Sequence, residues 1–236
     1  YFKFNLFKFL TNLDLSQNQL DYLSNDIFEL NEYLTYLNLS SNLFKLFSLN
    51  IFYNREFLLY LDLSFNQIEN ILYEKESSYL FSKIDLRNNN LTLFNLDMIT
   101  QISNLTYLDL SFNRLNAINL TTTSFLNQIR HFDLSMNQLK EFDRHFFFKF
   151  ISLIDLNLSC NKFEEFRDES LGGMTNLEYL NLSHNRIKNI HEDVFETLIV
   201  LKKLDLSVNK LREFGQLTFY FCFHLKYLNL SRYNLE

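Results

Sequence analysis

An eleven-residue phrase recurs along this chain at an almost constant spacing, and no other feature limits the possible folds as strongly. At 177–187 it reads LEYLNLSHNRI, with leucine at the first, fourth and sixth places and asparagine at the ninth. Successive copies begin 24 residues apart, except for one step of 23 residues. The copies open at Leu10, Leu34, Leu58, Phe81, Leu105, Ile129, Leu153, Leu177, Leu201 and Leu225. A period of this size predicts stacked structural repeats.

The phrase itself predicts a strand. Leu180 and Leu182 alternate with Tyr179, Asn181 and Ser183, so apolar and polar side chains point to opposite faces. Because every repeat crosses in the same direction, the strands of successive repeats should form a parallel sheet. Each repeat must then return over the outside of the molecule before the next strand begins.

The return segments carry two columns of residues at fixed places. The first, 13 residues after each opening, is always apolar: Leu23, Phe47, Ile71, Phe94, Ile118, Phe142, Phe166, Ile190 and Phe214. The second, 18 residues after the opening, is apolar except at Glu76 and Thr123, where we expect locally irregular turns. These columns predict the outer half of a continuous core, shared by neighbouring repeats.

An asparagine occupies the ninth place of the phrase in nine of the repeats. An amide side chain both donates and accepts hydrogen bonds, so it can satisfy backbone groups that a turn would leave buried. We expect a structural asparagine ladder, formed by Asn18, Asn42, Asn66, Asn89, Asn113, Asn137, Asn161, Asn185 and Asn209. The tenth copy has Tyr233 at this place, so the ladder should be disturbed there.

The consensus L-x-x-L-x-L-x-x-N-x-L resembles the 24-residue class of leucine-rich repeat found in extracellular animal proteins. The segments 61–66, 108–113 and 204–209 share the form L-D-L-S-x-N, which is similar to Toll-like receptor ectodomains and to chaoptin-like adhesion proteins. The resemblance implies an α/β fold, a horseshoe-shaped solenoid. A parallel β-sheet would line its concave side, and short irregular or single-turn helical segments would form its convex side. The absence of proline departs from many such repeats.

The period predicts one solenoid over residues 1–236. Residues 1–9 fit the tail of a truncated repeat, residues 10–224 form nine full repeats, and residues 225–236 begin a tenth. Neither end shows a capping module, although solenoids need polar ends to stay soluble. We therefore expect an internal fragment of a longer protein.

The sequence offers no constellation for catalysis, cofactor binding or metal binding. It has no glycine-rich phosphate loop and no metalloprotease or nucleophile-elbow motif. Cys160 and His184 fall in adjacent repeats, but two ligands alone do not make a zinc site. Cys160 follows a strand and Cys222 lies on the return of a different repeat, so the two should be too far apart for a disulfide. A net charge of −6 argues against nucleic-acid binding, and no apolar run predicts direct membrane contact.

Three asparagines of the fourth and fifth repeats head sequons that are glycosylation acceptors if the chain is secreted: Asn90, Asn104 and Asn119. Asn119 is the most informative, because the repeat consensus does not require asparagine at that place. With the resemblance, these sequons favour the extracellular side of the plasma membrane, on a parent protein that is single-pass or anchored. A cytoplasmic location is the alternative.

The remaining variable places on the strand face predict a binding surface. Exposed aromatic side chains with flanking charges are typical of binding hot spots. The candidates are Tyr36, Tyr60, Phe65, Tyr107, Phe112, His131, Asp155, Tyr179, Lys203 and Tyr227. His131 and Asp155 take equivalent places in adjacent strands, about 5 Å apart by the usual strand spacing, so they should form a pair.

The favoured function is therefore non-catalytic: ligand recognition by a cell-surface receptor, with Toll-like innate immune recognition as the leading case. A chaoptin-like adhesion or matrix protein is the first alternative. An intracellular scaffold or adaptor is the second, and an accessory module of an enzyme is the third. The expected partner is a protein ligand or co-receptor. A homo- or heterodimer formed through other parts of the parent protein is a further expectation.

Overall fold

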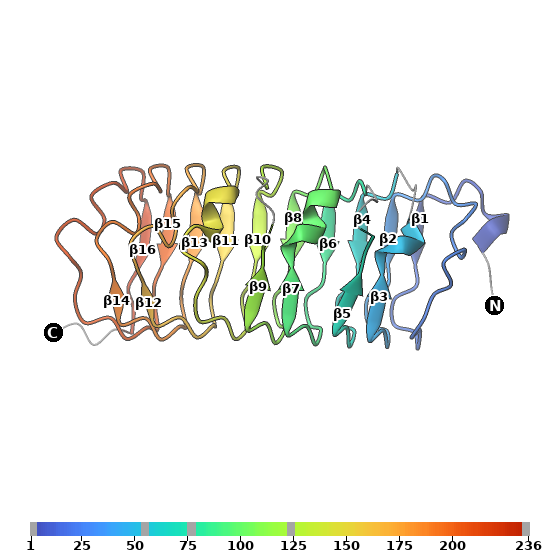
Figure 1. The fold of residues 1–236 in the computed structure, drawn as a ribbon, viewed down its shortest axis with the longest axis horizontal. Coiled ribbons are helices and arrows are strands. Elements are labelled where there is room, and N and C mark those ends of the chain that lie inside the picture. The colour runs from blue at the N-terminus through green and yellow to red at the C-terminus, as the bar shows by residue number, and fades with distance from the viewer. Residues whose placement is uncertain (1–3, 53–56, 75–78, 122–125, 233–236) are drawn as a thin grey trace.

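The computed structural model describes residues 4–52, 57–74, 79–121 and 126–232. The chain winds into an elongated parallel-sheet solenoid, with its two ends at opposite ends of the molecule (Figure 1). Each turn contributes one strand to a ten-stranded sheet on the concave side, which we call the long sheet. The predicted solenoid and its parallel sheet are thereby confirmed.

The long sheet contains three-residue strands that all run in parallel. In spatial order they are β1 (Asn12–Asp14), β2 (Tyr36–Asn38), β4 (Tyr60–Asp62), β6 (Lys83–Asp85), β8 (Tyr107–Asp109), β10 (His131–Asp133), β11 (Asp155–Asn157), β13 (Tyr179–Asn181), β15 (Lys203–Asp205) and β16 (Tyr227–Asn229).

The register of the long sheet follows the sequence period. Leu37 pairs with Leu61, which in turn pairs with Ile84, so the 23-residue step is absorbed without a shift in the sheet. Residues at this middle place point into the core, and Leu61 is fully buried. The first and third residues of each strand face outward. We call this exposed side of the long sheet the sheet face.

The return segments contain short strands as well as turns and 3-10 helices. The strands form three parallel pairs: β3 (Leu46–Ser48) with β5 (Asn70–Leu72), β7 (Leu93–Asn95) with β9 (Ala117–Asn119), and β12 (Glu165–Phe166) with β14 (Asn189–Ile190). Among the described residues, the helices are η1 (Phe4–Leu6), η2 (Leu49–Phe52), η3 (Leu96–Gln101) and η4 (Phe146–Lys149).

The paired return strands arise at the first apolar column of the returns. Phe47 pairs with Ile71, Phe94 with Ile118, and Phe166 with Ile190. These side chains must point inward at the same height in adjacent repeats, which holds both backbones extended and close enough to share ladder hydrogen bonds. The sequence predicts only short irregular or single-turn helical segments here, so the paired strands are an additional feature of the returns. The places expected to be irregular, Glu76 and Thr123, lie outside the described residues.

Phenylalanine fills much of the outer core. Phe28 and Phe52, at the second return column, stack with ring centroids 6.0 Å apart. Phe142 contacts Phe147 and Phe163 with centroids at 4.8 and 5.5 Å. Each ring therefore packs against rings in its own repeat or the next. This sharing of faces is what stabilises repeats that could not fold singly.

The asparagine ladder ties successive repeats together. Asn113 Nδ2 donates to the carbonyl of Leu110 in its own repeat at 3.1 Å and to that of Leu86 in the preceding repeat at 3.0 Å. Asn113 Oδ1 in turn accepts from the Leu91 backbone N–H at 3.0 Å. The same three-way pattern occurs at Asn42, Asn66, Asn89, Asn137, Asn161, Asn185 and Asn209. Tyr233 lies outside the described residues.

Candidate functional site

A single file of side chains runs along the sheet face, formed by the first residue of each strand of the long sheet from β2 to β16. In register order it contains Tyr36, Tyr60, Lys83, Tyr107, His131, Asp155, Tyr179, Lys203 and Tyr227. We call it the aromatic–charge column. Neighbouring members come from adjacent strands, which lie about 5 Å apart. Side chains here must therefore contact one another or point apart.

From Tyr36 to Tyr107 the members of the column contact one another. The rings of Tyr36 and Tyr60 stack with centroids 4.7 Å apart and planes 10° from parallel. Lys83 Nζ lies 5.1 Å from the Tyr60 ring centroid and 4.2 Å from that of Tyr107. The ammonium group is thus held between two aromatic rings, within the range of cation–π attraction.

The column continues through a histidine. The rings of Tyr107 and His131 lie 6.0 Å apart, and His131 Nδ1 lies 3.7 Å from Asp155 Oδ2. Further along, Lys203 Nζ lies 5.3 Å from the Tyr179 ring centroid. The result is a strip, half-buried except at Lys203 and Tyr227, that combines aromatic and charged groups, a composition suited to recognising another polypeptide.

A second row of side chains, formed by the third residue of each strand, borders the column, and carboxylates fill four successive places of this row. Asp62, Asp85, Asp109 and Asp133 occupy four successive strands. Each Oδ1 accepts from the backbone N–H two residues later, as Asp109 does from Ser111 at 2.9 Å. At other points in the sheet an asparagine separates the acids and donates to them, as Asn157 Nδ2 does to Asp133 Oδ2 at 3.0 Å.

Burial raises the pKa of two of these acids. The pKa of Asp85 is raised to about 6, first by burial and then by the neighbouring carboxylates of Asp109 and Asp62, against the opposing backbone hydrogen bond from Arg87. Burial also raises the pKa of Asp133. The pKa values of Tyr60 and Tyr107 rise to about 12, chiefly through burial and secondarily through nearby aspartates. Both tyrosines therefore remain neutral donors at physiological pH.

Phe65 and Phe112 lie beside the column rather than in it. Each occupies the place before a ladder asparagine, in the turn that follows the strand, and each has a positive φ, 55° and 53° respectively. About half of each side chain is exposed (51% and 48%). Arg87 Cζ lies 5.7 Å from the Phe65 ring centroid, which joins that ring to the charged groups of the sheet face.

The same left-handed backbone recurs before every ladder asparagine. The residues are Gln17, Ser41, Phe65, Asn88, Phe112, Met136, Cys160, His184 and Val208. The turn needed to aim the asparagine imposes this conformation, although most of these residues disfavour it. The repeat therefore exposes one side chain per turn along the edge of the sheet face.

The structure places the predicted binding residues in two groups. Tyr36, Tyr60, Tyr107, His131 and Asp155 belong to the contiguous part of the column. Tyr179, Lys203 and Tyr227 continue it towards the C-terminal end, whereas Phe65 and Phe112 stand apart in the edge turns. Sequence reasoning missed Lys83 and Arg87. Lys83 takes the third place of the phrase that opens at Phe81, as Tyr60 and Tyr107 do in theirs, so the repeat alignment could have found it.

A separate open groove of about 780 Å³ lies between the ladder turns and the returns of three successive repeats. Phe142, Phe163 and Phe166 contribute its apolar surface, and charged side chains form its walls. Several of those charges are already paired, as Lys188 Nζ is with Glu164 Oε2 at 2.8 Å. The charged side chains of the groove are therefore less available for binding a ligand than those of the sheet face.

The remaining predicted positions have simple surroundings. Asn104 and Asn119 are exposed, and Asn90 is half-buried. Cys160 and Cys222 are free thiols, and burial raises the pKa of Cys222 to about 11, so it is a poor nucleophile at neutral pH. Across the described ranges, helices are all too short to cross a bilayer.

Comparison with known proteins identifies the repeat. Residues 81–139, 128–187 and 175–235 each match a family described as leucine rich repeat, and residues 56–71 match a second family of that description. No curated protein sequence matches the chain.

Solved structures with a similar fold belong to several different proteins. The chain is 25% identical to the protein in a TLR13–ssRNA13 complex, with a TM-score of 0.66 over 93% of this chain. It is 25% identical to the leucine-rich repeat domain of APL1B, with a TM-score of 0.75 over 96% of this chain. A leucine-rich repeat protein from Bacteroides eggerthii is 20% identical, with a TM-score of 0.74 over 94% of this chain, and that likeness concerns the fold alone.

The chain spans only part of these proteins: 28% of the TLR13 chain, 63% of the APL1B chain and 39% of the Bacteroides chain. The agreement is therefore with their repeat regions. Family matches cover residues 81–235, and each turn of the solenoid supplies one strand to the long sheet. The chain belongs to the leucine-rich-repeat family.

Proposed function

We propose that this protein-binding repeat module is the ligand-recognition segment of a cell-surface receptor, with Toll-like innate immune recognition as the favoured case. The aromatic–charge column supports the proposal. From Tyr36 to Asp155 it presents three tyrosines, a lysine held between two of them and a His–Asp pair, all half-buried on one face. Tyrosine gives large contact area at low cost in conformational entropy, and solenoids bind through extended surfaces of this kind.

The charge of the sheet face favours a protein ligand over a nucleic acid. The four-carboxylate row lies directly beside the column, and the whole chain has a net charge of −6. Phosphate groups would meet this field unfavourably, because nucleic-acid affinity depends on neutralising phosphates with Lys and Arg. The single-stranded RNA in the TLR13 complex is a property of that protein. We expect a short single-stranded RNA to bind this chain no more tightly than it binds a neutral control protein.

Selection of displayed peptides tests whether the column is the recognition surface. Phage-displayed random peptides are selected on the wild-type chain, and the recovered binders are titrated against Tyr107→Ala and Tyr179→Ala chains. We expect most binders to weaken about tenfold or more on Tyr107→Ala, because truncating a hot-spot aromatic costs about 2 kcal/mol or more. Tyr220→Ala is the matched control, since Tyr220 is 61% exposed but lies on a return. Binders that respond equally to Tyr220→Ala, or ignore Tyr107→Ala, would contradict the proposal.

Phe112→Asn separates loss of binding from loss of stability. Asn88 occupies the equivalent place one repeat earlier with the same left-handed backbone, φ 54°. Because a non-glycine residue in this region costs about 1–2 kcal/mol and asparagine tolerates it well, we expect Phe112→Asn to leave stability unchanged or raise it by up to ~1 kcal/mol. Urea unfolding measures this. Peptides that contact the edge turn should nevertheless bind the variant more weakly.

Expression through a secretory pathway tests the extracellular assignment. Asn104 and Asn119 are exposed, so both sequons are accessible to the transferase. We expect a glycosidase-sensitive shift in electrophoretic mobility that shrinks stepwise in Asn104→Gln and Asn119→Gln chains. An unmodified, secreted chain would favour the intracellular scaffold instead. Aggregation of beads coated with the chain alone would favour an adhesion protein over a receptor.

A further inference from the structure

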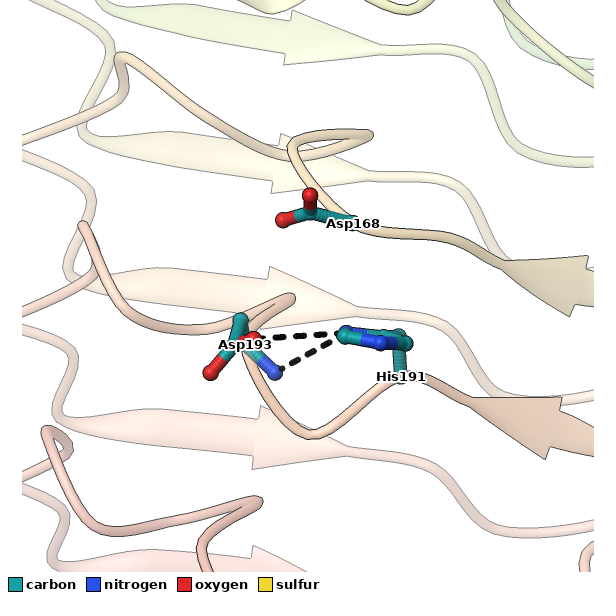
Figure 2. Close-up of side chains that lie close together, drawn as sticks. All are labelled: Asp168, His191 and Asp193. Carbon is teal, nitrogen blue, oxygen red and sulfur yellow. Dashed lines mark hydrogen bonds and ion pairs between the residues drawn. The ribbon is translucent and has the colours of Figure 1, made fainter.

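Three metal-ligating side chains meet on the returns of two adjacent repeats, away from the sheet face. Figure 2 shows Asp168 on one return and His191 and Asp193 on the next, with dashed lines that join His191 to Asp193. One ligand atom from each lies within 4.8 Å of the others. All three are half-buried or exposed, so a solvated ion has direct access.

His191 Nδ1 faces both the carboxylate and the backbone of Asp193. It lies 3.6 Å from Asp193 Oδ2 and 3.4 Å from the Asp193 backbone nitrogen. The second distance exceeds the usual range of an N–H···N or N–H···O hydrogen bond, so the Nδ1 lone pair is only weakly engaged. A cation that took this lone pair would displace one weak interaction.

In two other repeats the residue equivalent to His191 is not a histidine, and its side chain accepts a hydrogen bond from the backbone N–H two residues later. Asn95 Oδ1 accepts from the Asp97 backbone N–H at 2.9 Å, and Ser48 Oγ accepts from that of Asn50 at 3.3 Å. A short oxygen-bearing side chain therefore suffices to cap this turn. The imidazole at 191 is a poorer cap than asparagine, and it adds a nitrogen donor beside two carboxylates.

One of the two carboxylates has a weak ion pair with an arginine, and the other faces only the histidine among the described residues. Arg144 approaches Asp168 Oδ2 at 3.5 Å, but its closer partner is Glu169 Oε2 at 2.9 Å. Asp193 has His191 as its ion-pair partner among the described residues. A divalent cation would balance the two carboxylate charges, and the neutral imidazole would complete a three-donor set.

We propose that Asp168, His191 and Asp193 form a binding site for a zinc-like divalent cation that joins two adjacent returns. One imidazole nitrogen with two carboxylate oxygens suits Zn²⁺ and related first-row ions, whereas Ca²⁺ and Mg²⁺ prefer oxygen donors throughout. Three protein donors leave a fourth tetrahedral position for water or a partner's side chain. The site was not predicted from sequence, because only the stacking of repeats brings Asp168 and His191 together.

Titration calorimetry with ZnCl₂ on the full chain tests the site, with CaCl₂ as the comparison. We expect one Zn²⁺ per chain, bound more tightly than Ca²⁺. His191→Asn and Asp193→Asn should each weaken Zn²⁺ binding by more than about tenfold, since even loss of an outer-shell partner of a metal ligand costs that much. His191→Asn keeps an acceptor for the turn, as Asn95 shows, and circular dichroism checks that the fold is retained.

Two controls separate this site from other donors. His145→Gln removes a histidine that pairs with a single carboxylate, Glu169, at 3.2 Å on a neighbouring return, and it should leave Zn²⁺ binding unchanged. Cys160→Ser removes the half-exposed thiol and should likewise have no effect. The proposal is overturned if His191→Asn binds Zn²⁺ like the wild-type chain. It is also overturned if either control abolishes binding, or if no stoichiometric Zn²⁺ binds.

Discussion

The ladder asparagines show how one side chain can hold two repeats together. From Asn42 to Asn185 each is buried, and its amide uses both its donor and its acceptor capacity on backbone groups. No other side chain of this size combines a two-hydrogen donor with a carbonyl acceptor in fixed geometry. Aspartate has the same shape but cannot donate when ionised. The identity of this residue is therefore dictated by hydrogen bonding rather than by packing.

Asn113→Ala is expected to lower the free energy of unfolding by about 3–5 kcal/mol. The buried backbone N–H of Leu91 loses its acceptor, and the bonds to the carbonyls of Leu86 and Leu110 are lost as well. An unsatisfied buried group costs about 1–3 kcal/mol and each further bond about 1 kcal/mol. Urea unfolding measures the change. Asn18→Ala is the control, because Asn18 is exposed and bonds only within its own turn, so its loss should cost under ~1 kcal/mol.

At the scale of elements, the strands of the long sheet place like-charged aspartates close together. Parallel register places Asp62, Asp85 and Asp109 side by side, and the Asx-type hydrogen bond holds each against the sheet. The bond can be made equally well by asparagine, as Asn38, Asn157 and Asn181 show at the same place. Carboxylates are thus not required for the fold at these positions.

Asp85→Asn is expected to stabilise the protein at neutral pH and to flatten its pH dependence. The pKa of Asp85 is about 6 in the folded state, above the ordinary value of 3.8, so the native state binds the extra proton between these values. Wild-type stability should therefore fall as pH rises from about 4 to 6, by an amount of the order of 3 kcal/mol if the full difference is realised. Urea unfolding at pH 4.5 and 7.5 should show a gain for the variant only at the higher pH. A gain of equal size at both would refute the ionic explanation.

On the scale of the whole molecule, the solenoid is held together by contacts between successive turns. The strands of the long sheet pair only with those of neighbouring turns, and the same register recurs along its length. Stability should then behave as a sum of repeat terms and interface terms. The chain should therefore tolerate a deletion only when it removes whole repeats and so restores this register.

Deletion of one full repeat and of half a repeat should have opposite outcomes. Removing residues 177–200 joins Asn176 to Leu201 and preserves the order of strand, ladder turn and return. We expect a folded chain with the β-type circular dichroism spectrum and a lower unfolding midpoint. Removing only residues 177–188 takes out β13 and leaves β14 with no strand of the long sheet before it, and this chain should fail to fold. Similar stability of the two deletions would contradict a register-based solenoid.

Much of this architecture could be predicted because residues of the same type recur at the same place in successive repeats. The leucines of the phrase predict the long sheet, and the places of Phe47 and Phe94 predict the outer core. The aromatic residues Tyr36, Tyr60 and Tyr107 were found as candidates because they occupy variable, outward places of the phrase. Lys83 was missed because candidates at these places were chosen mainly for aromatic character, and the paired return strands were missed because they depend on the relative height of two backbones.

The sequence by itself determined the fold class, the register of the long sheet and the face available for recognition. Period-2 alternation and a 24-residue period leave few other ways to bury the leucines. Only the tertiary structure decided which outward side chains meet. Lys83 lies between two rings, four acids share one row, and Asp168 approaches His191 because separate turns are stacked at strand spacing. Such contacts depend on distances between turns, and no local pattern of residues encodes them.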